Sequence, residues 1–133
     1  MNQKDRKRLR NACDKLWSEI TKIIHIRKHG RICLWCKKMT DKLQSDHVFN
    51  RWKTATRWNP SNCVVLCAPC HLFRKKREPI LWAEIAKAEL TDDVYEELKI
   101  VSQQECKPDY LTIKMWLEGL KRTLTKPETE GIV

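Results

Sequence analysis

The sequence predicts an α+β protein whose centre is a strand, a long loop, a second strand and a short helix, stapled by a four-cysteine zinc site and surrounded by α-helices. Three observations lead to this prediction. Two C-x-x-C pairs are separated by 30 residues. Short stretches beside them have the alternating or apolar character of strands. Segments on both sides repeat apolar residues at helical spacing. With 133 residues, the chain has the size of one domain with a modest core.

Residues 1–30 are predicted to form a basic amphipathic helix. Residues 4–28 lack proline and glycine, and Gly30 is a stop signal. Cations lie between the apolar residues, so one face is apolar and the other is positively charged. The apolar residues at helical spacing are Leu9, Ala12, Leu16, Ile20, Ile23 and Ile24.

Residues 31–78 show little helical periodicity and are rich in Cys, His, Trp and Arg. The stretch "LQSDHVF" predicts a short strand at 43–49, and "CVVL" predicts its partner at 63–66, with a loop between them. Pro69 stands where a helix would begin, so residues 69–77 are predicted to form a short basic helix.

Residues 79–125 predict three further helices. Pro79 suits the first turn of a helix that runs to about Leu90, the acidic pair at 92–93 opens the next, and Pro108 opens the last. Residues 126–133 are predicted to form a flexible tail. The tryptophans assigned to the core are Trp17, Trp82 and Trp116, and the last helix carries an apolar stripe of Tyr110, Ile113, Leu117 and Leu120.

Positive charge is concentrated in the first part of the chain. Residues 1–78 carry 20 Lys and Arg against 6 Asp and Glu, whereas residues 79–133 carry 7 against 11. A net charge of +14 over the first 78 residues attracts a polyanion, and nucleic acid is the expected partner. A merely solvated basic surface is the alternative.

The sequence predicts a cytoplasmic protein without a membrane partner. No apolar run approaches the roughly 18 residues that span a bilayer, and the N-terminal stretch "MNQKDRKRLR" lacks the apolar segment of a signal peptide. In that reducing compartment, seven cysteines favour metal binding over disulfides.

Cys33 and Cys36 form the first C-x-x-C pair, and Cys67 and Cys70 form the second. Two such pairs are typical of a structural zinc site with four thiolate ligands. A redox dithiol at "CAPC" is the alternative, but it would leave the first pair unexplained. The cysteines without such spacing are predicted to be buried small apolar residues; they are Cys13, Cys63 and Cys106.

His71 follows directly after Cys70. Neighbours on a helix point about 100° apart, so these two side chains cannot easily share one ion. The helix would instead turn His71 toward the strand that carries Asp46 and His47. A carboxylate and two imidazoles converging near the amide of Asn62 predict a second metal site, with an open coordination position suited to catalysis.

These residues resemble the motif of the HNH endonuclease family. The similarity lies in "DH" at 46–47, "NCVVLC" from residue 62 and "CAPCH" ending at residue 71, and the C-x-x-C pairs are similar to those of zinc-containing members. The stretch "HVFNRWKTATRWNPSN" looks most like small phage members, including the NinG-like recombination group. The resemblance covers residues 31–78. It implies the strand–strand–helix (ββα-metal) finger and hydrolysis of phosphodiester bonds in DNA, by a phage-encoded protein in the host cytoplasm.

The resemblance also implies a role for each residue of the motif. His47 would be the general base that takes a proton from the attacking water. Asp46 and His71 would hold a divalent ion, either Mg²⁺, Mn²⁺ or another transition metal, that stabilises charge on the phosphate. Asn62 would either orient His47 or add a metal ligand.

The expected substrate is double-stranded or branched DNA, read with little sequence specificity because no base-reading pattern is recognisable. Three alternatives remain: a non-catalytic zinc-dependent nucleic-acid-binding module, a phage recombination or packaging accessory protein, and a protein–protein adaptor that works through its acidic C-terminal half. The cations expected to contact DNA phosphates are Arg51, Lys53, Arg57, Arg74, Lys75, Lys76 and Arg77.

Overall fold

The longest element is the N-terminal helix α1 (Gln3–His29). The side chain of Asn2 caps its start by accepting a hydrogen bond from the backbone N–H of Asp5 at 2.9 Å. Gly30 ends it with φ +83°, a conformation that costs glycine little. The computed structural model describes residues 1–126, and it confirms the predicted helix, which begins two residues and ends one residue inside the predicted range of 1–30. The predicted tail at 126–133 lies almost entirely outside the described residues.

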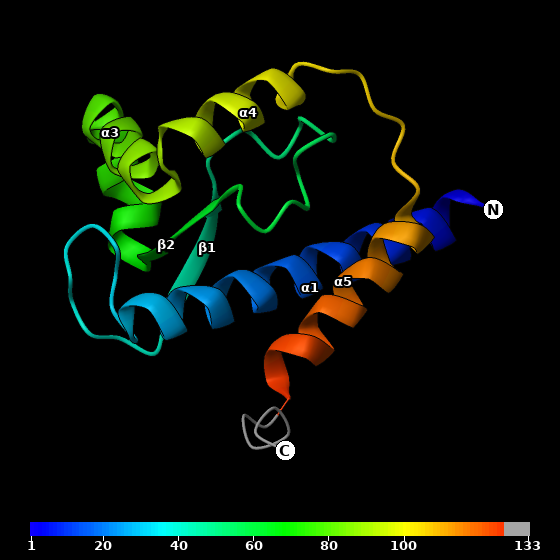
Figure 1. Cartoon of the computed structure of the whole chain (residues 1–133), viewed down its shortest axis with the longest axis horizontal. Helices are drawn as coiled ribbons and strands as arrows, with labels where there is room; N and C mark the ends of the chain where they lie inside the picture. Colours follow the sequence, from blue (N-terminus) through cyan, green and yellow to red (C-terminus); the bar gives the residue numbers. More distant parts are fainter. Residues whose placement is uncertain (127–133) are drawn as a thin grey trace.

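A two-stranded antiparallel hairpin lies between α1 and the helices of the opposite side (Figure 1). Strand β1 (Leu43–His47) pairs with β2 (Cys63–Cys67), and the register places Leu43 opposite Cys67 and His47 opposite Cys63. The predicted strands are confirmed, although β1 ends at His47 instead of continuing to Phe49. The hydroxyls of Thr21 on α1 and Ser45 on β1, 2.7 Å apart, join the hairpin to the helix.

The short helix predicted after β2 is divided in two. A π-helical turn, η1 (Cys70–Arg74), is followed by one α-helical turn, α2 (Lys75–Arg77). The N–H of Lys75 donates to the carbonyl of Cys70, five residues earlier. Such turns widen the backbone locally and occur frequently at functional sites.

The three C-terminal helices are α3 (Pro79–Leu90), α4 (Asp92–Ser102) and α5 (Tyr110–Thr125). Pro79 lies in the first turn of α3, and Asp92 and Asp93 lie in the first turn of α4, as predicted. Helix α5 begins two residues after Pro108, where Asp109 accepts a hydrogen bond from the N–H of Thr112 at 3.2 Å.

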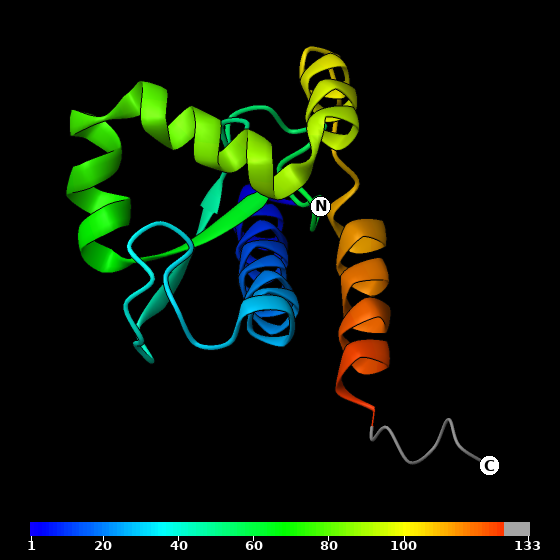
Figure 2. The same cartoon turned by 60° about the vertical axis from the view of Figure 1, so that its left-hand side comes forward.

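The C-terminal helices do not pack as one unit. Helices α3 and α4 cover the hairpin, whereas α5 returns to lie beside α1 (Figures 1 and 2). Two cores result. The first is formed by Cys33, Leu34, Trp35, Val64, Leu66, Cys67, Cys70, Ala86, Leu90 and Leu98. The second is formed by Cys13, Trp17, Ile20, Trp58 and Leu117.

The three tryptophans that were predicted to lie in the core differ in burial. Trp17 is buried with 3 % exposed and Trp82 packs at the edge of the first core, but Trp116 is 56 % exposed and its assignment to the core is wrong. It lies on the side of α5 that faces away from α1, because the contact stripe of α5 centres on Leu117. Within residues 1–126, none of the helices is both long and apolar enough to cross a bilayer.

The cysteines outside the C-x-x-C pairs also differ among themselves. Cys13 is fully buried, and burial raises the pKa of its thiol to about 11. Cys63 is half-buried, and Cys106 is exposed in the segment between α4 and α5. The prediction of a buried apolar role is therefore confirmed for Cys13 and wrong for Cys106.

Candidate metal centre and adjoining catalytic residues

The two C-x-x-C pairs meet at the end of the hairpin. The sulfur atoms of Cys33, Cys36, Cys67 and Cys70 all lie within 4.8 Å of one another. The Sγ atoms of Cys36 and Cys67 are 3.7 Å apart, and two sulfurs bound tetrahedrally to zinc at 2.3 Å would be separated by about 3.8 Å. The same distance is far above the 2.05 Å or so of a disulfide. This cluster could therefore hold one zinc ion.

The backbone around each pair explains why the thiols converge. After Cys33 the chain turns sharply: the N–H of Lys37 donates to the carbonyl of Cys33, and Lys37 has φ +63°. The N–H of Leu34 donates to the carbonyl of Val65 and ties this turn to β2. Cys67 ends β2 and Cys70 begins η1, so the second pair straddles a strand-to-helix turn.

The thiols of the cluster differ in pKa: burial raises the pKa of Cys67 and of Cys70, whereas the pKa of Cys33 is lowered. Burial acts to raise this pKa, but hydrogen bonds from the backbone at Cys67, Cys36 and Trp35 outweigh burial and lower the pKa to about 7. A lowered thiol pKa favours the anionic form that metal ions bind.

His71 lies outside the cysteine cluster, as its position next to Cys70 predicted. Its Nδ1 is 3.6 Å from Oδ1 of Asp46, on the neighbouring strand β1. Within residues 1–126 only three buried side-chain polar atoms lack a hydrogen-bond partner, and two of them are His71 Nδ1 and Asp46 Oδ2. Buried polar atoms are rarely left unpaired, so each such pair needs an explanation. A divalent cation between them would satisfy both, since imidazole nitrogen and carboxylate oxygen are ordinary ligands.

Lys75 also reaches Asp46. Its Nζ is 3.0 Å from both carboxylate oxygens, although only the approach to Oδ1 has hydrogen-bond geometry. The same ammonium lies 4.3 Å from the centre of the Trp82 ring. Asp46 is 5 % exposed, and a buried carboxylate is stable only when it is paired with positive charge. Lys75 supplies that charge in this structure.

His47 ends β1 and is oriented from two directions. Its ring stacks on Trp17 of α1, with centroids 3.9 Å apart and planes 5° from parallel. Its Nε2 is 2.9 Å from the carbonyl oxygen of Arg57. A carbonyl oxygen only accepts hydrogen bonds, so Nε2 carries the hydrogen and the neutral ring keeps a lone pair on Nδ1. Burial lowers the pKa of His47, which keeps the ring neutral near pH 7.

His47 does not join Asp46 and His71 in one contact cluster. Consecutive residues on a strand point to opposite faces, and here Asp46 faces η1 and α2 while His47 faces α1. The structure thus brings Asp46 and His71 together as predicted. It places the imidazole of His47 at the same end of β1 but on the other side of the hairpin.

Asn62 forms hydrogen bonds with the loop between β1 and β2. The side chain is fully buried, and its Oδ1 accepts from the N–H of Phe49 at 2.7 Å. Its Nδ2 donates to the carbonyls of Phe49 and Thr56. All three hydrogen bonds hold the loop between β1 and β2. The carbonyl of Arg57, one residue after Thr56 in this loop, contacts Nε2 of His47. Asn62 therefore holds the loop whose Arg57 carbonyl contacts His47, while its Oδ1 is engaged by the N–H of Phe49.

Arg57 has a different place from the one predicted for it. The guanidinium is almost fully buried and forms two hydrogen bonds with Asp14 of α1, at 2.7 and 3.1 Å. Trp58 donates to the same carboxylate from Nε1 at 2.8 Å. The prediction that Arg57 contacts DNA is therefore wrong. Its side chain fastens the loop to α1 and offers no free surface to a phosphate.

The other predicted cations divide into engaged and free side chains. Arg74 lies 4.3 Å from the centre of the Trp35 ring and forms an ion pair with Glu78 at 2.9 Å. Lys76 and Arg77 are exposed and form no ion pair within residues 1–126. Arg51, Trp52 and Lys53 are exposed at the tip of the loop. Arg51 lies 3.8 Å from Asp14, so the exposed predicted cations that form no ion pair within residues 1–126 are Lys53, Lys76 and Arg77.

Comparison of the chain with protein-family models, with curated proteins and with solved structures found no match.

Two residues of the site were not singled out by the sequence as functional. Trp17 was predicted to be a core residue, and nothing in its spacing shows that its ring stacks on His47. Asp14, which holds Arg57, is one of the few acids in a basic helix, and that isolation is the signal that could have marked it. An acid that stands alone among cations frequently has a specific partner, because it is not needed for solubility.

Proposed function

We propose that this protein is a metal-dependent endonuclease of the HNH type that hydrolyses phosphodiester bonds in DNA. The observation that carries the proposal is the approach of His71 to the buried Asp46, because Nδ1 of His71 and Oδ2 of Asp46 are both buried and lack a hydrogen-bond partner. Two protein ligands leave the remaining positions of a divalent ion open to water and phosphate oxygen. Such an ion, when bound, would stabilise the charge that develops on the phosphate.

Side chains of the protein would supply the general base, the contacts to DNA and the ligands of a structural zinc. His47 lies at the same end of β1 as Asp46, although its ring faces α1. It would accept the proton of a water bound at this end of the strand at Nδ1, because Nε2 is held by the carbonyl of Arg57. Trp17 keeps the ring in one plane, so the acceptor points in a constant direction. The exposed cations of the loop and the short helix would hold the DNA backbone beside the site. The four cysteines would bind a structural zinc that fixes η1, and with it His71, relative to the hairpin.

One observation favours a second function, that of a zinc-dependent nucleic-acid-binding module without catalysis. Lys75 already neutralises Asp46, and a protein with no need for a divalent ion would retain such a pair. The same basic surface would then bind DNA without cutting it.

Supercoiled plasmid distinguishes the two functions. We expect the purified protein to convert it to nicked or linear DNA in Mg²⁺ or Mn²⁺, and to stop when EDTA is added, because the hydrolytic ion is held by two protein ligands only. A gel mobility assay at the same protein concentration serves as the control for binding. Protein that binds the plasmid but leaves it intact with every divalent ion would support the binding module instead.

Charge reversal tests the DNA surface. Changing both Lys76 and Arg77 to glutamate should weaken DNA binding about equally for unrelated sequences, because phosphate contacts carry no base information. The slope of log K against log salt should become shallower by about 2, since each lost phosphate contact contributes about 1. Lys99→Glu, at an exposed position on α4, is the matched control and should change binding little. Wild-type affinity and slope in the double variant would show that DNA binds elsewhere.

A further inference from the structure

A second cluster of side chains that can bind a metal is formed by residues of α1 and α3, and it includes neither the cysteines nor Asp46. His25 and His29 are one turn apart on α1 and therefore lie on the same face. Their ring centroids are 5.0 Å apart. Glu89, near the end of α3, approaches them from the other side, with Oε2 at 2.6 Å from His29 Nε2. One ring nitrogen of each histidine and one carboxylate oxygen all lie within 4.8 Å of one another.

The surroundings of His25 are those of a metal-binding histidine. The residue is 6 % exposed, and its Nε2 lies 2.6 Å from the carbonyl oxygen of Ile32. Because that carbonyl only accepts, Nε2 carries the hydrogen and Nδ1 keeps the lone pair. Histidines that ligate metals usually donate their second N–H to a backbone carbonyl in this way. The alternative is a purely structural cluster, in which His29 pairs with Glu89 and His25 only bonds the Ile32 carbonyl.

Lys28 is a competing cation at the same carboxylate. Its Nζ lies 2.8 Å from Glu89 Oε1, while the Oε2 atom faces His29. The lysine side chain is 58 % exposed, so it can turn into solvent at little cost. The Glu89 side chain is only 15 % exposed and stays in the cluster. The last turn of α1 also favours positive charge, because its free carbonyls carry the negative end of the helix dipole.

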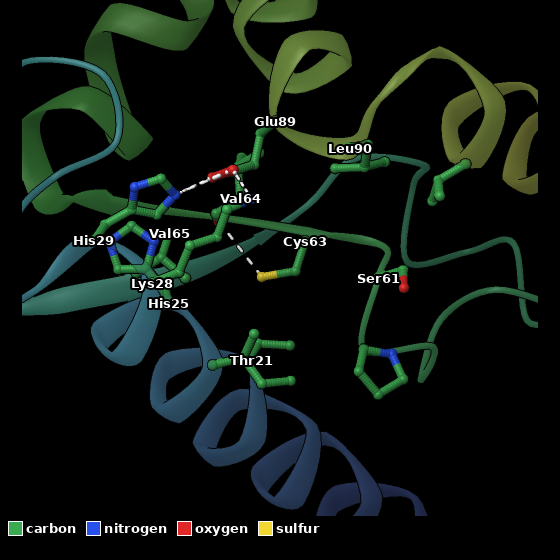
Figure 3. Close-up of a pocket in the computed structure, with 13 residues that line it drawn as sticks. Thr21, His25, Lys28, His29, Ser61, Cys63, Val64, Val65, Glu89 and Leu90 are labelled. Carbon is green, nitrogen blue, oxygen red and sulfur yellow. Dashed lines mark hydrogen bonds and ion pairs between the residues drawn. The ribbon is translucent and has the colours of Figure 1, made fainter.

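A cavity of about 220 Å³ adjoins the cluster (Figure 3). His25, His29 and Glu89 lie at one end of it, and Thr21, Ser61 and Cys63 belong to its lining. Three protein ligands leave one position of a tetrahedral ion free, and this cavity has room for water there. A closed structural site would instead be filled by a fourth side chain.

We propose that His25, His29 and Glu89 bind a transition metal ion of the zinc class, with its fourth position open to the cavity. Two imidazoles and one carboxylate form a ligand set that zinc and its neighbours in the Irving–Williams order bind well. Mg²⁺ prefers oxygen ligands alone and would bind here weakly. The site is independent of the proposed nuclease function, because it shares no residue with the Asp46 and His71 pair.

Metal analysis tests this site without reference to activity. The His71→Ala protein, with its cysteine cluster intact, removes any contribution from the Asp46 pair. After equilibrium dialysis against buffered free Zn²⁺, we expect this protein to hold two zinc ions per chain. Adding Glu89→Gln, which keeps the size of the side chain, should reduce the count to one. Excess Mg²⁺ during dialysis should not displace the second ion.

Two further variants separate a metal site from a helix-joining ion pair. Lys28→Met removes the competing ammonium and should bind the second zinc more tightly, whereas an ion-pair network without a metal gains nothing from that change. His29→Ala should lose the second zinc even if its melting temperature also falls. A single zinc in the His71→Ala protein, or two zinc ions retained after both His29→Ala and Glu89→Gln, would overturn the proposal.

Discussion

Replacing both Cys33 and Cys67 with serine should leave the finger unfolded and without its zinc. A four-thiolate site stabilises a small domain by about 10–16 kcal/mol of metal-binding free energy, and that is comparable to the whole stability of an ordinary domain, about 5–15 kcal/mol. Both residues also belong to the first core, so their sulfurs contribute packing as well. In a Glu89→Gln background, which removes the second zinc site proposed above, we expect the zinc retained through purification to fall from one per chain to none, and the cooperative thermal transition to disappear.

Cys106→Ser is the matched control, because it removes a thiol that is exposed and distant from the cluster. Its zinc content and melting temperature should equal those of the wild type. A Cys33→Ser, Cys67→Ser protein that kept stoichiometric zinc and melted normally would show that the cysteine cluster is not the metal site.

The second large effect is expected at His47. His47→Ala should lower the rate of plasmid cleavage by about 10² to 10⁴, the usual contribution of a general base. Zinc content and DNA affinity should stay close to wild type, because the His47 ring contacts Trp17 and the Arg57 carbonyl and is not part of the four-cysteine cluster. Cleavage rates at saturating divalent ion, with circular dichroism as the check on folding, provide the measurement.

His71→Ala is the informative companion to that variant. If His71 helps to hold the hydrolytic ion, its loss should raise the concentration of Mg²⁺ or Mn²⁺ needed for half-maximal cleavage, and high concentrations should restore part of the rate. High metal should not rescue His47→Ala. Loss of the tightly held zinc from the His71→Ala protein would place His71 in the cysteine cluster and contradict the two-site interpretation.

The elements that could be predicted from the sequence are those set by local rules. Proline and aspartate at helix starts placed α3 and α4, and Gly30 placed the end of α1, because these residues act within one turn. The cysteine spacing predicted the four-sulfur cluster for a similar reason, since one ion must be reached by all four ligands. The direction of His71 followed from helix geometry alone.

The features that could not be predicted depend on how distant segments pack. Nothing local shows that Trp17 lies under His47, that Asp14 holds Arg57, or that the short basic helix begins with a π-helical turn. Trp116 was wrongly predicted to be buried because α5 carries apolar residues on both sides of Leu117. Only the position of α1 decides which side is covered.

The packing of α1 against α5 affects the order in which the protein can fold during synthesis. The thiol of Cys13 donates to the carbonyl of Tyr110, 97 residues further along. Trp17, the platform of His47, lies in the same core as Leu117. During synthesis the cysteine finger can therefore close while one apolar side of α1 still lacks its cover. The platform under His47 becomes enclosed only when the last helix has left the ribosome, so a chain truncated before α5 would present a folded finger beside an exposed, aggregation-prone helix.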